Sequence, residues 1–167
     1  MADPAAPARV QLIDQALLAA VVARAVDSER GRINHNFHAG PADNPHRFLN
    51  ALTRGSYCAP HRHAAPPKAE SFLVLSGEVL VVLFGDSGEV REHHVLGRAG
   101  LVGIDIVPGA WHTIAAVSPT AVCYEVKPGP WDPATDKEFA PWAPREGDPR
   151  APAVLEGWLA DLAPLVG

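Results

Sequence analysis

The chain has 167 residues, of which 47% are hydrophobic and 20% charged, and its formal net charge is −5 at pH 7. This length suffices for one domain with a substantial core, and the acidic balance offers no basic face, so we expect no nucleic-acid partner. The 17 prolines and 14 glycines suit short strands joined by turns, and the 2 cysteines are too few for a disulfide-rich secreted framework.

The first predicted element is a helix from about Asp14 to Val26, where apolar side chains recur at helical spacing. Asp14 is a suitable N-cap, and Gly31 is a stop signal. The apolar run at 16–23 is too short to span a bilayer and lacks the positive flank of a signal peptide. We therefore expect a helix packed on the outside of a β body, no membrane partner, and a cytoplasmic location in which both cysteines stay thiols.

From Ile33 onward, short apolar runs are separated by Gly, Pro, Asp and Asn at intervals of about eight to twelve residues. This spacing is typical of an all-β sandwich or barrel. The predicted strands cover residues 33–38, 47–53, 57–63, 71–75, 78–84, 90–96, 101–106, 111–117 and 121–127.

The C-terminal part begins with a proline-rich segment, residues 128–152, which contains too many prolines for a helix or a central strand. We expect it to run as an extended strap held by Trp131, Phe139 and Trp142, and to end in a short helix near 154–162. The predicted organisation is one domain with three parts: an N-terminal helical extension at 1–31, a barrel at 32–127, and the strap with its helix at 128–167.

A pair of histidines, His61 and His63, lies on one predicted strand. Alternate side chains of a strand share a face, so both imidazoles point the same way and can reach one divalent ion. Glu70 and His112, brought by other strands, are the candidates that would complete a first shell of nitrogen and oxygen ligands. The alternative is a chance pair of histidines on a solvated strand.

His38 is a candidate for proton transfer or substrate contact. Asn34, Asn36 and His38 share one face of their predicted strand, and an imidazole titrates near neutral pH. The alternative is a histidine that only makes a hydrogen bond at the end of the strand. Cys58 precedes the histidine pair, but alternation places it on the opposite face, so we expect a core cysteine rather than a ligand.

Glu125 is the second catalytic candidate, because it interrupts an apolar strand where an unpaired acid is costly to bury. It either orients a ligand histidine or forms an ion pair with Arg47 or Lys127. Lys68 is expected near the mouth of the site, as a contact for an anionic substrate or as an ordinary solvated charge.

Two motifs resemble those of the cupin superfamily: Gly55-x5-His61-x-His63 followed by Glu70-x6-Gly77, and Val107-Pro-Gly-Ala-Trp-His112. The interval between His63 and Glu70 is longer than in the usual cupin pattern. Stretches at 32–38, 47–50, 72–78 and 125–144 are similar to the WbuC-type cupin fold metalloproteins, and the resemblance extends from about residue 12 to residue 146.

The resemblance implies a double-stranded β-helix, the cupin jelly-roll barrel, with a divalent metal held by His61, His63, Glu70 and His112. The ion would be Fe, Mn, Ni or Zn. The implied function is a metal-binding cupin acting on a small molecule, such as a sugar or an activated sugar in surface-polysaccharide biosynthesis, and the resemblance names no reaction. If the protein is an enzyme, the candidate activities are metal-dependent isomerase- or epimerase-like chemistry and dioxygenase chemistry. A non-haem Fe(II) dioxygenase or oxidase and a non-catalytic binding or sensor protein are the alternatives. A homodimer is expected.

Overall fold

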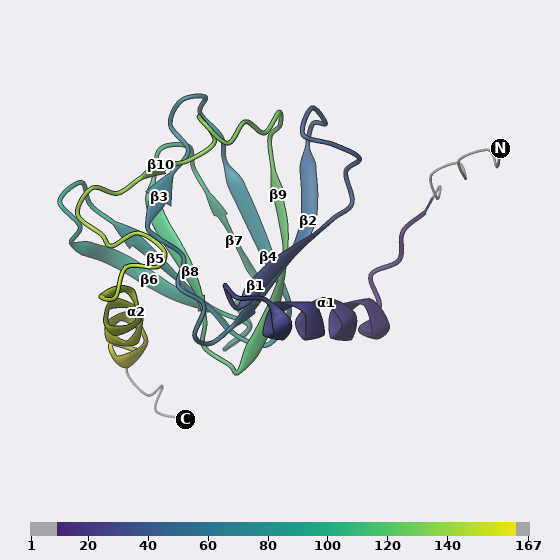
Figure 1. The fold of residues 1–167 in the computed structure, drawn as a ribbon, viewed down its shortest axis with the longest axis horizontal. Coiled ribbons are helices and arrows are strands. Elements are labelled where there is room, and N and C mark those ends of the chain that lie inside the picture. The colour runs from purple at the N-terminus through teal and green to yellow at the C-terminus, as the bar shows by residue number, and fades with distance from the viewer. Residues whose placement is uncertain (1–9, 163–167) are drawn as a thin grey trace.

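The computed structural model of the protein describes residues 10–162, in which the strands form two five-stranded antiparallel sheets (Figure 1). In spatial order, the first sheet consists of β1 (Arg32–Asn36), β2 (His46–Thr53), β9 (Thr120–Lys127), β4 (Glu70–Ser76) and β7 (Gly103–Ile106). The second sheet consists of β10 (Glu138–Phe139), β3 (His61–Arg62), β8 (Trp111–Ala116), β5 (Val79–Phe84) and β6 (Val90–Leu96). The predicted all-β jelly roll is confirmed.

The chain crosses repeatedly between the sheets, and the side chains that face inward form the core between them. The sequence of β5 is apolar throughout, and nearly every residue in this strand is buried. Val79 and Val81 belong to the core cluster between the sheets, whereas Leu80 and Val82 belong to a second cluster on the outer face. A strand that is covered on both faces has no polar alternation.

Helix α1 (Gln15–Asp27) covers the outer face of the first sheet, as the sequence predicts. The carboxylate of Asp14 caps it by accepting a hydrogen bond from the Leu17 amide at 2.8 Å. Val21 packs on Leu49 and Val122 in a buried cluster. The helix ends before Gly31, which instead forms the turn into β1 with a φ of +64°.

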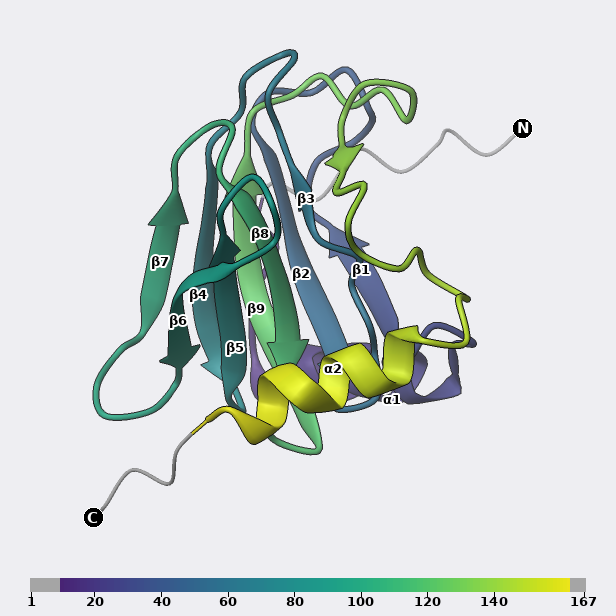
Figure 2. The same ribbon diagram turned by 90° about the vertical axis from the view of Figure 1, so that its left-hand side faces the viewer.

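Helix α2 (Ala151–Ala160) lies across the second sheet (Figure 2). It starts three residues earlier than predicted, because Pro152 is accommodated in the first helical turn, where the missing amide hydrogen is not needed. Leu155 and Leu159 pack in the same cluster as Trp111. The strap between β9 and α2 contains turns at 133–136, 141–143, 146–147 and 149–150, and the short strand β10, which pairs with β3. The expectation of a strap that is extended throughout is therefore wrong.

The strand predicted at 57–63 is much shorter in the structure, where only His61 and Arg62 form β3. His61 is paired with His112 of β8, which brings two of the predicted ligands together across the second sheet. Within residues 10–162, no helix is both long and apolar enough to cross a membrane. The three-part division of the chain stays a prediction.

Candidate metal centre and its cavity

The structure gathers the four predicted metal ligands into one cluster. His61 lies in β3, His63 directly follows it, Glu70 begins β4, and His112 lies in β8. All four side chains are at most 5% exposed. One potential ligand atom from each of them lies within 4.8 Å of those of the other three, so the cluster could hold a metal ion. The longer interval before Glu70 does not keep its carboxylate away.

Backbone carbonyls hold all three imidazoles in the same tautomer. Nδ1 of His61 lies 3.0 Å from the Ala59 carbonyl oxygen, and Nδ1 of His112 lies 2.9 Å from that of Ala110. Nδ1 of His63 contacts the carbonyl oxygen of Asp136. Since each Nδ1–H donates to a carbonyl, each Nε2 keeps its lone pair for a metal ion.

The carboxylate of Glu70 faces two of these nitrogens, with Oε1 3.0 Å from Nε2 of His63 and Oε2 2.9 Å from Nε2 of His112. Nε2 of His63 is buried and has no hydrogen-bond partner among the described residues. A carboxylate oxygen and an imidazole lone pair repel each other unless a cation lies between them. The set of three nitrogens and a carboxylate therefore fits a divalent first-row metal such as Fe, Mn, Ni or Zn.

Protonation favours the same conclusion. Burial lowers the pKa of His61 well below its usual range, so its imidazole is neutral and able to bind a metal. The Lys127 ammonium, 3.3 Å from Oε1 of Glu70, favours the ionised carboxylate, which is the form that binds a metal.

A chain of buried charges connects the cluster to the strap. The Lys68 ammonium donates to Oδ1 of Asp136 at 2.8 Å, and the Lys127 ammonium lies 3.0 Å from Oδ2 of Asp136 and 3.3 Å from Oε1 of Glu70. Burial would raise the pKa of Asp136, but the two lysines hold it below its usual range. Lys68 is 4% exposed, so the expectation of a lysine at the mouth of the site is wrong.

Sequence reasoning missed Asp136 and the role of Lys68. Asp136 belongs to the strap, far from the histidines in sequence, and no periodic pattern surrounds it. A signal was present for Lys127, which follows Glu125 at strand spacing in an otherwise apolar run. Two charges on one face of a buried strand indicate a polar interior.

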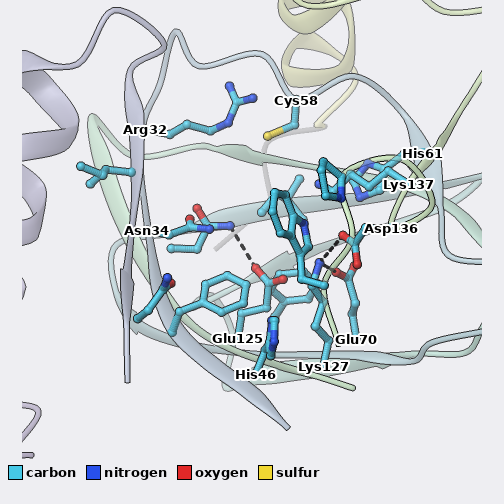
Figure 3. Close-up of a pocket in the computed structure, with 18 of the residues that line it drawn as sticks. Arg32, Asn34, His46, Cys58, His61, Glu70, Glu125, Lys127, Asp136 and Lys137 are labelled. Atoms are coloured by element: carbon cyan, nitrogen blue, oxygen red, sulfur yellow. Dashed lines mark hydrogen bonds and ion pairs between the residues drawn. The ribbon is translucent and has the colours of Figure 1, made fainter. Parts of the chain in front are cut away.

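The metal-ligand cluster opens into a cavity of about 740 Å³ between the two sheets and the strap (Figure 3). His61, Glu70 and His112 are among the residues that line it. Both catalytic candidates, His38 and Glu125, line the same cavity. Its volume is in the range of small-molecule sites.

Glu125 is buried in the cavity wall, where its Oε2 accepts a hydrogen bond from Nδ2 of Asn50 at 3.1 Å. No ion pair joins Glu125 to Arg47 or Lys127 within residues 10–162, so the structure does not show the predicted pairing. Burial and the nearby charge of Glu70 raise the pKa of Glu125 to about 8. The group can therefore hold or release a proton near neutral pH.

This raised pKa predicts a pH-dependent stability. Between about pH 4.5 and 8, the folded protein holds a proton on Glu125 that the unfolded chain has released, so the free energy of unfolding falls as pH rises through that window. We expect Glu125→Gln to flatten this slope by up to about 1.4 kcal/mol per pH unit in metal-free protein. Urea unfolding at several pH values measures it, and parallel slopes for both proteins would contradict the assignment.

His38 lies just beyond the end of β1, held by its neighbours in β2. Its Nδ1 contacts both backbone groups of Arg47, at 3.0 Å from the oxygen and 3.2 Å from the nitrogen. Its ring stacks on that of His46, with centroids 4.0 Å apart. His46 is buried and also lines the cavity, a position that sequence reasoning did not single out. Nε2 of His38 is the ring nitrogen left for a ligand.

Cys58 packs against the core between the sheets and is not one of the four clustered ligands, as predicted, but it also lines the cavity, so the predicted orientation away from the histidines is wrong. Strand alternation does not apply, because residues 57–60 lie outside β3. Burial raises the pKa of the Cys58 thiol, which makes it a poor nucleophile. Both Cys58 and Cys123 are free thiols, as expected.

Comparisons with known proteins support the fold. A family model described as a domain of unknown function, DUF6016, matches residues 13–96. No curated protein matches the chain in sequence. A crystal structure of CapF from Staphylococcus aureus, a capsular polysaccharide assembling protein, is similar with a TM-score of 0.53 and 21% identity, over 65% of this chain and 31% of that one.

Two L-ribose isomerases are also similar in structure. The enzyme of Cellulomonas parahominis has a TM-score of 0.53 and 18% identity, over 65% of this chain and 69% of that one. The enzyme of Geodermatophilus obscurus has a TM-score of 0.54 and 16% identity, over 67% and 70%. The chain spans about a third of the length of the CapF structures, at 33% in one of them. These likenesses show a cupin-like fold.

Proposed function

The chain belongs to the family of the domain of unknown function DUF6016. We propose that this protein is a metal-dependent enzyme that acts on a small hydroxylated carbonyl compound, a sugar or an activated sugar. One observation carries the proposal. The buried cluster of three imidazoles and a carboxylate opens into the cavity that also holds Glu125, a buried acid with a pKa of about 8. A metal site beside a group that exchanges protons suits isomerisation or epimerisation.

Each part of the cavity has a distinct task in this proposal. A divalent ion held by His61, His63, Glu70 and His112 would polarise a substrate oxygen. In its ionised form, Glu125 takes a proton from the hydroxyl-bearing carbon next to the carbonyl and returns it to the former carbonyl carbon, while the hydroxyl proton moves to the former carbonyl oxygen, so atoms and electrons balance without an oxidant. The Asn50 amide orients the Glu125 carboxyl group through their 3.1 Å hydrogen bond.

The structural relatives are compatible with this chemistry at the level of fold. Proteins with this fold include L-ribose isomerases, which supports an aldose–ketose isomerisation as the reaction class to test first. The likeness to a capsular polysaccharide assembling protein supports a place in surface-polysaccharide biosynthesis, as does the resemblance to WbuC-type proteins. Fold analogy supplies the order of testing, and the site supplies the mechanism.

The test is exchange of carbon-bound hydrogen in D₂O, followed by proton NMR, with metal-loaded protein and a panel of aldoses and ketoses. We expect metal-dependent deuterium incorporation, a loss of about 10²-fold or more in Glu125→Gln, and a smaller loss in His38→Ala, both with unchanged metal content. The control is His35→Ala, which alters a residue of β1 that is not among those lining the cavity, and it should exchange hydrogen like the wild type.

Oxygen consumption by the iron-loaded protein without hydrogen exchange would instead favour the dioxygenase alternative. Saturable binding of the sugars with neither exchange nor oxygen consumption would favour the binding-protein alternative. Either result would overturn the proposed proton transfer by Glu125.

A further inference from the structure

Three asparagine side chains line the cavity on the first sheet, apart from the metal-ligand cluster. Asn34 and Asn36 lie in β1, and Asn50 lies in β2. Asn34 is the register partner of Asn50, and Asn36 follows at strand spacing, so the three carboxamides share the inner face. In Figure 3, Asn34 lies on the opposite side of the cavity from Asp136 and Lys137.

Asn50 has an unmet hydrogen-bonding capacity. Its Nδ2 donates to Glu125, but its Oδ1 is buried and has no partner among the described residues. Buried polar atoms are rarely left unpaired, because each costs free energy when it loses water. A ligand hydroxyl in the cavity can donate to this oxygen. Asn34 and Asn36 are exposed, and their carboxamides offer both donors and acceptors to the same ligand.

The strap presents an aromatic ring to the same cavity. Trp131 lines the cavity and is 43% exposed, although its backbone amide is fixed by a 2.7 Å hydrogen bond to the Pro41 carbonyl. An indole on a held backbone offers a rigid apolar face at small entropic cost. The C–H groups of a saturated ring can cover such a face while the hydroxyls of that ring point to the carboxamides.

The positive charges at this part of the cavity are already engaged. Arg30 and Arg32 line the cavity, and both pair with Glu146, Arg30 at 2.9 Å. Arg32 also donates to the Tyr57 carbonyl at 3.0 Å and to the Ser56 hydroxyl at 3.2 Å. A phosphate would have to break these contacts, whereas a neutral hydroxylated group meets the carboxamides directly.

We propose that Asn34, Asn36, Asn50 and Trp131 form a subsite for a neutral, hydroxylated ring, the chemistry of a monosaccharide unit without a phosphate at that end. The inference rests on the proposed function, since it names the substrate class of the same cavity. β9 lies between β2 and β4, and the strand register aligns Asn36 with Phe72, and both Asn34 and Asn50 with Val74, two and four residues along β4 from Glu70. A ring bound at the carboxamides therefore lies beyond Glu125, and its substituents extend toward the metal-ligand cluster.

Binding of neutral aldopentoses and aldohexoses, and of their phosphate esters, tests the subsite in the full chain. The first measurement is the quenching of Trp131 fluorescence by acrylamide, obtained as the difference between the wild type and Trp131→Phe, which a bound sugar should reduce in a saturable way. The second is saturation-transfer NMR of the sugars. We expect neutral sugars to bind and protect Trp131. The double variant Asn34→Ala/Asn36→Ala should weaken binding about tenfold or more, and Trp131→Ala should weaken it while Trp131→Phe retains it.

His35→Ala, which alters the residue between the two asparagines, is the matched control and should bind like the wild type. Absence of saturable binding by any neutral sugar would overturn the subsite, and so would sugar binding with wild-type affinity in the double variant. Binding restricted to the phosphate esters would do the same and would identify an anion site. Binding is measured without turnover, both in metal-loaded protein and in protein treated with a chelator. The binding result therefore tests the subsite even if the proposed reaction does not occur.

Discussion

Replacing either His61 or His63 by alanine is expected to remove most of the bound metal while the barrel stays folded. Each imidazole is fixed by a carbonyl and contributes one lone pair to the cluster, so its loss leaves three of the four ligands. Loss of a single supporting partner of a metal ligand typically costs 10- to 100-fold in affinity, and we expect loss of a ligand itself to cost more than about 100-fold. Elemental analysis of purified, dialysed protein gives the stoichiometry.

Thermal unfolding provides an independent measure. A metal that binds only the folded state adds about 2.7 kcal/mol when its concentration is a hundred times its Kd. EDTA should therefore lower the melting temperature of the wild type and leave that of either variant unchanged. His93→Ala, which alters an exposed histidine of β6, is the control and should retain both the metal and the EDTA response. Full occupancy in both single variants would refute the assignment.

Replacing Asp136 by asparagine is expected to destabilise the fold strongly. The carboxylate stands between the Lys68 and Lys127 ammonium groups, and all three side chains are at most 6% exposed. Removing one partner of a buried ion pair leaves uncompensated charge in a low dielectric and costs about 3 to 5 kcal/mol. We also expect weaker metal binding, because the Asp136 carbonyl holds Nδ1 of His63 and moves if the strap detaches.

Glu138→Gln is the matched control, because Glu138 lies two residues further along the same strap. It pairs with Arg62 at 2.8 Å, but its side chain is 50% exposed, so its loss should destabilise the protein far less than the loss of Asp136. Urea denaturation of both variants compares the two pairs. Equal destabilisation by the two substitutions would show that the buried charges do not hold the strap.

The secondary structure was largely predictable because its signals are local. Asp14 caps the first helix, since a carboxylate one residue before an apolar helical stripe satisfies a free amide wherever the helix later packs. The run from Val79 to Phe84 forms β5 as expected. The short strand β10 at Glu138 and Phe139 was not predictable, because it exists only through its pairing with β3.

In the candidate site, too, some residues could be predicted from local sequence patterns and others could not. The spacing of His61, His63 and His112 indicated ligands, and the structure places all three beside Glu70. The predicted orientation of Cys58 failed because it assumed a regular strand at 57–63, whereas only His61 and Arg62 form β3. Lys68 was expected at the surface, because lysines usually are, and only the strap that covers it makes it a buried partner.

The sequence by itself determined most of the helices and strands, the type of fold and the ligand chemistry, because helix caps, alternating strands and imidazole pairs depend on residues a few positions apart. Only the tertiary structure decided which charges lie in water and which lie in the interior. Asp136 and Lys127 face each other at 3.0 Å because the strap folds back over the barrel. The energy of a charge depends on what surrounds it in space, and the raised pKa of Glu125 is a property of that packing.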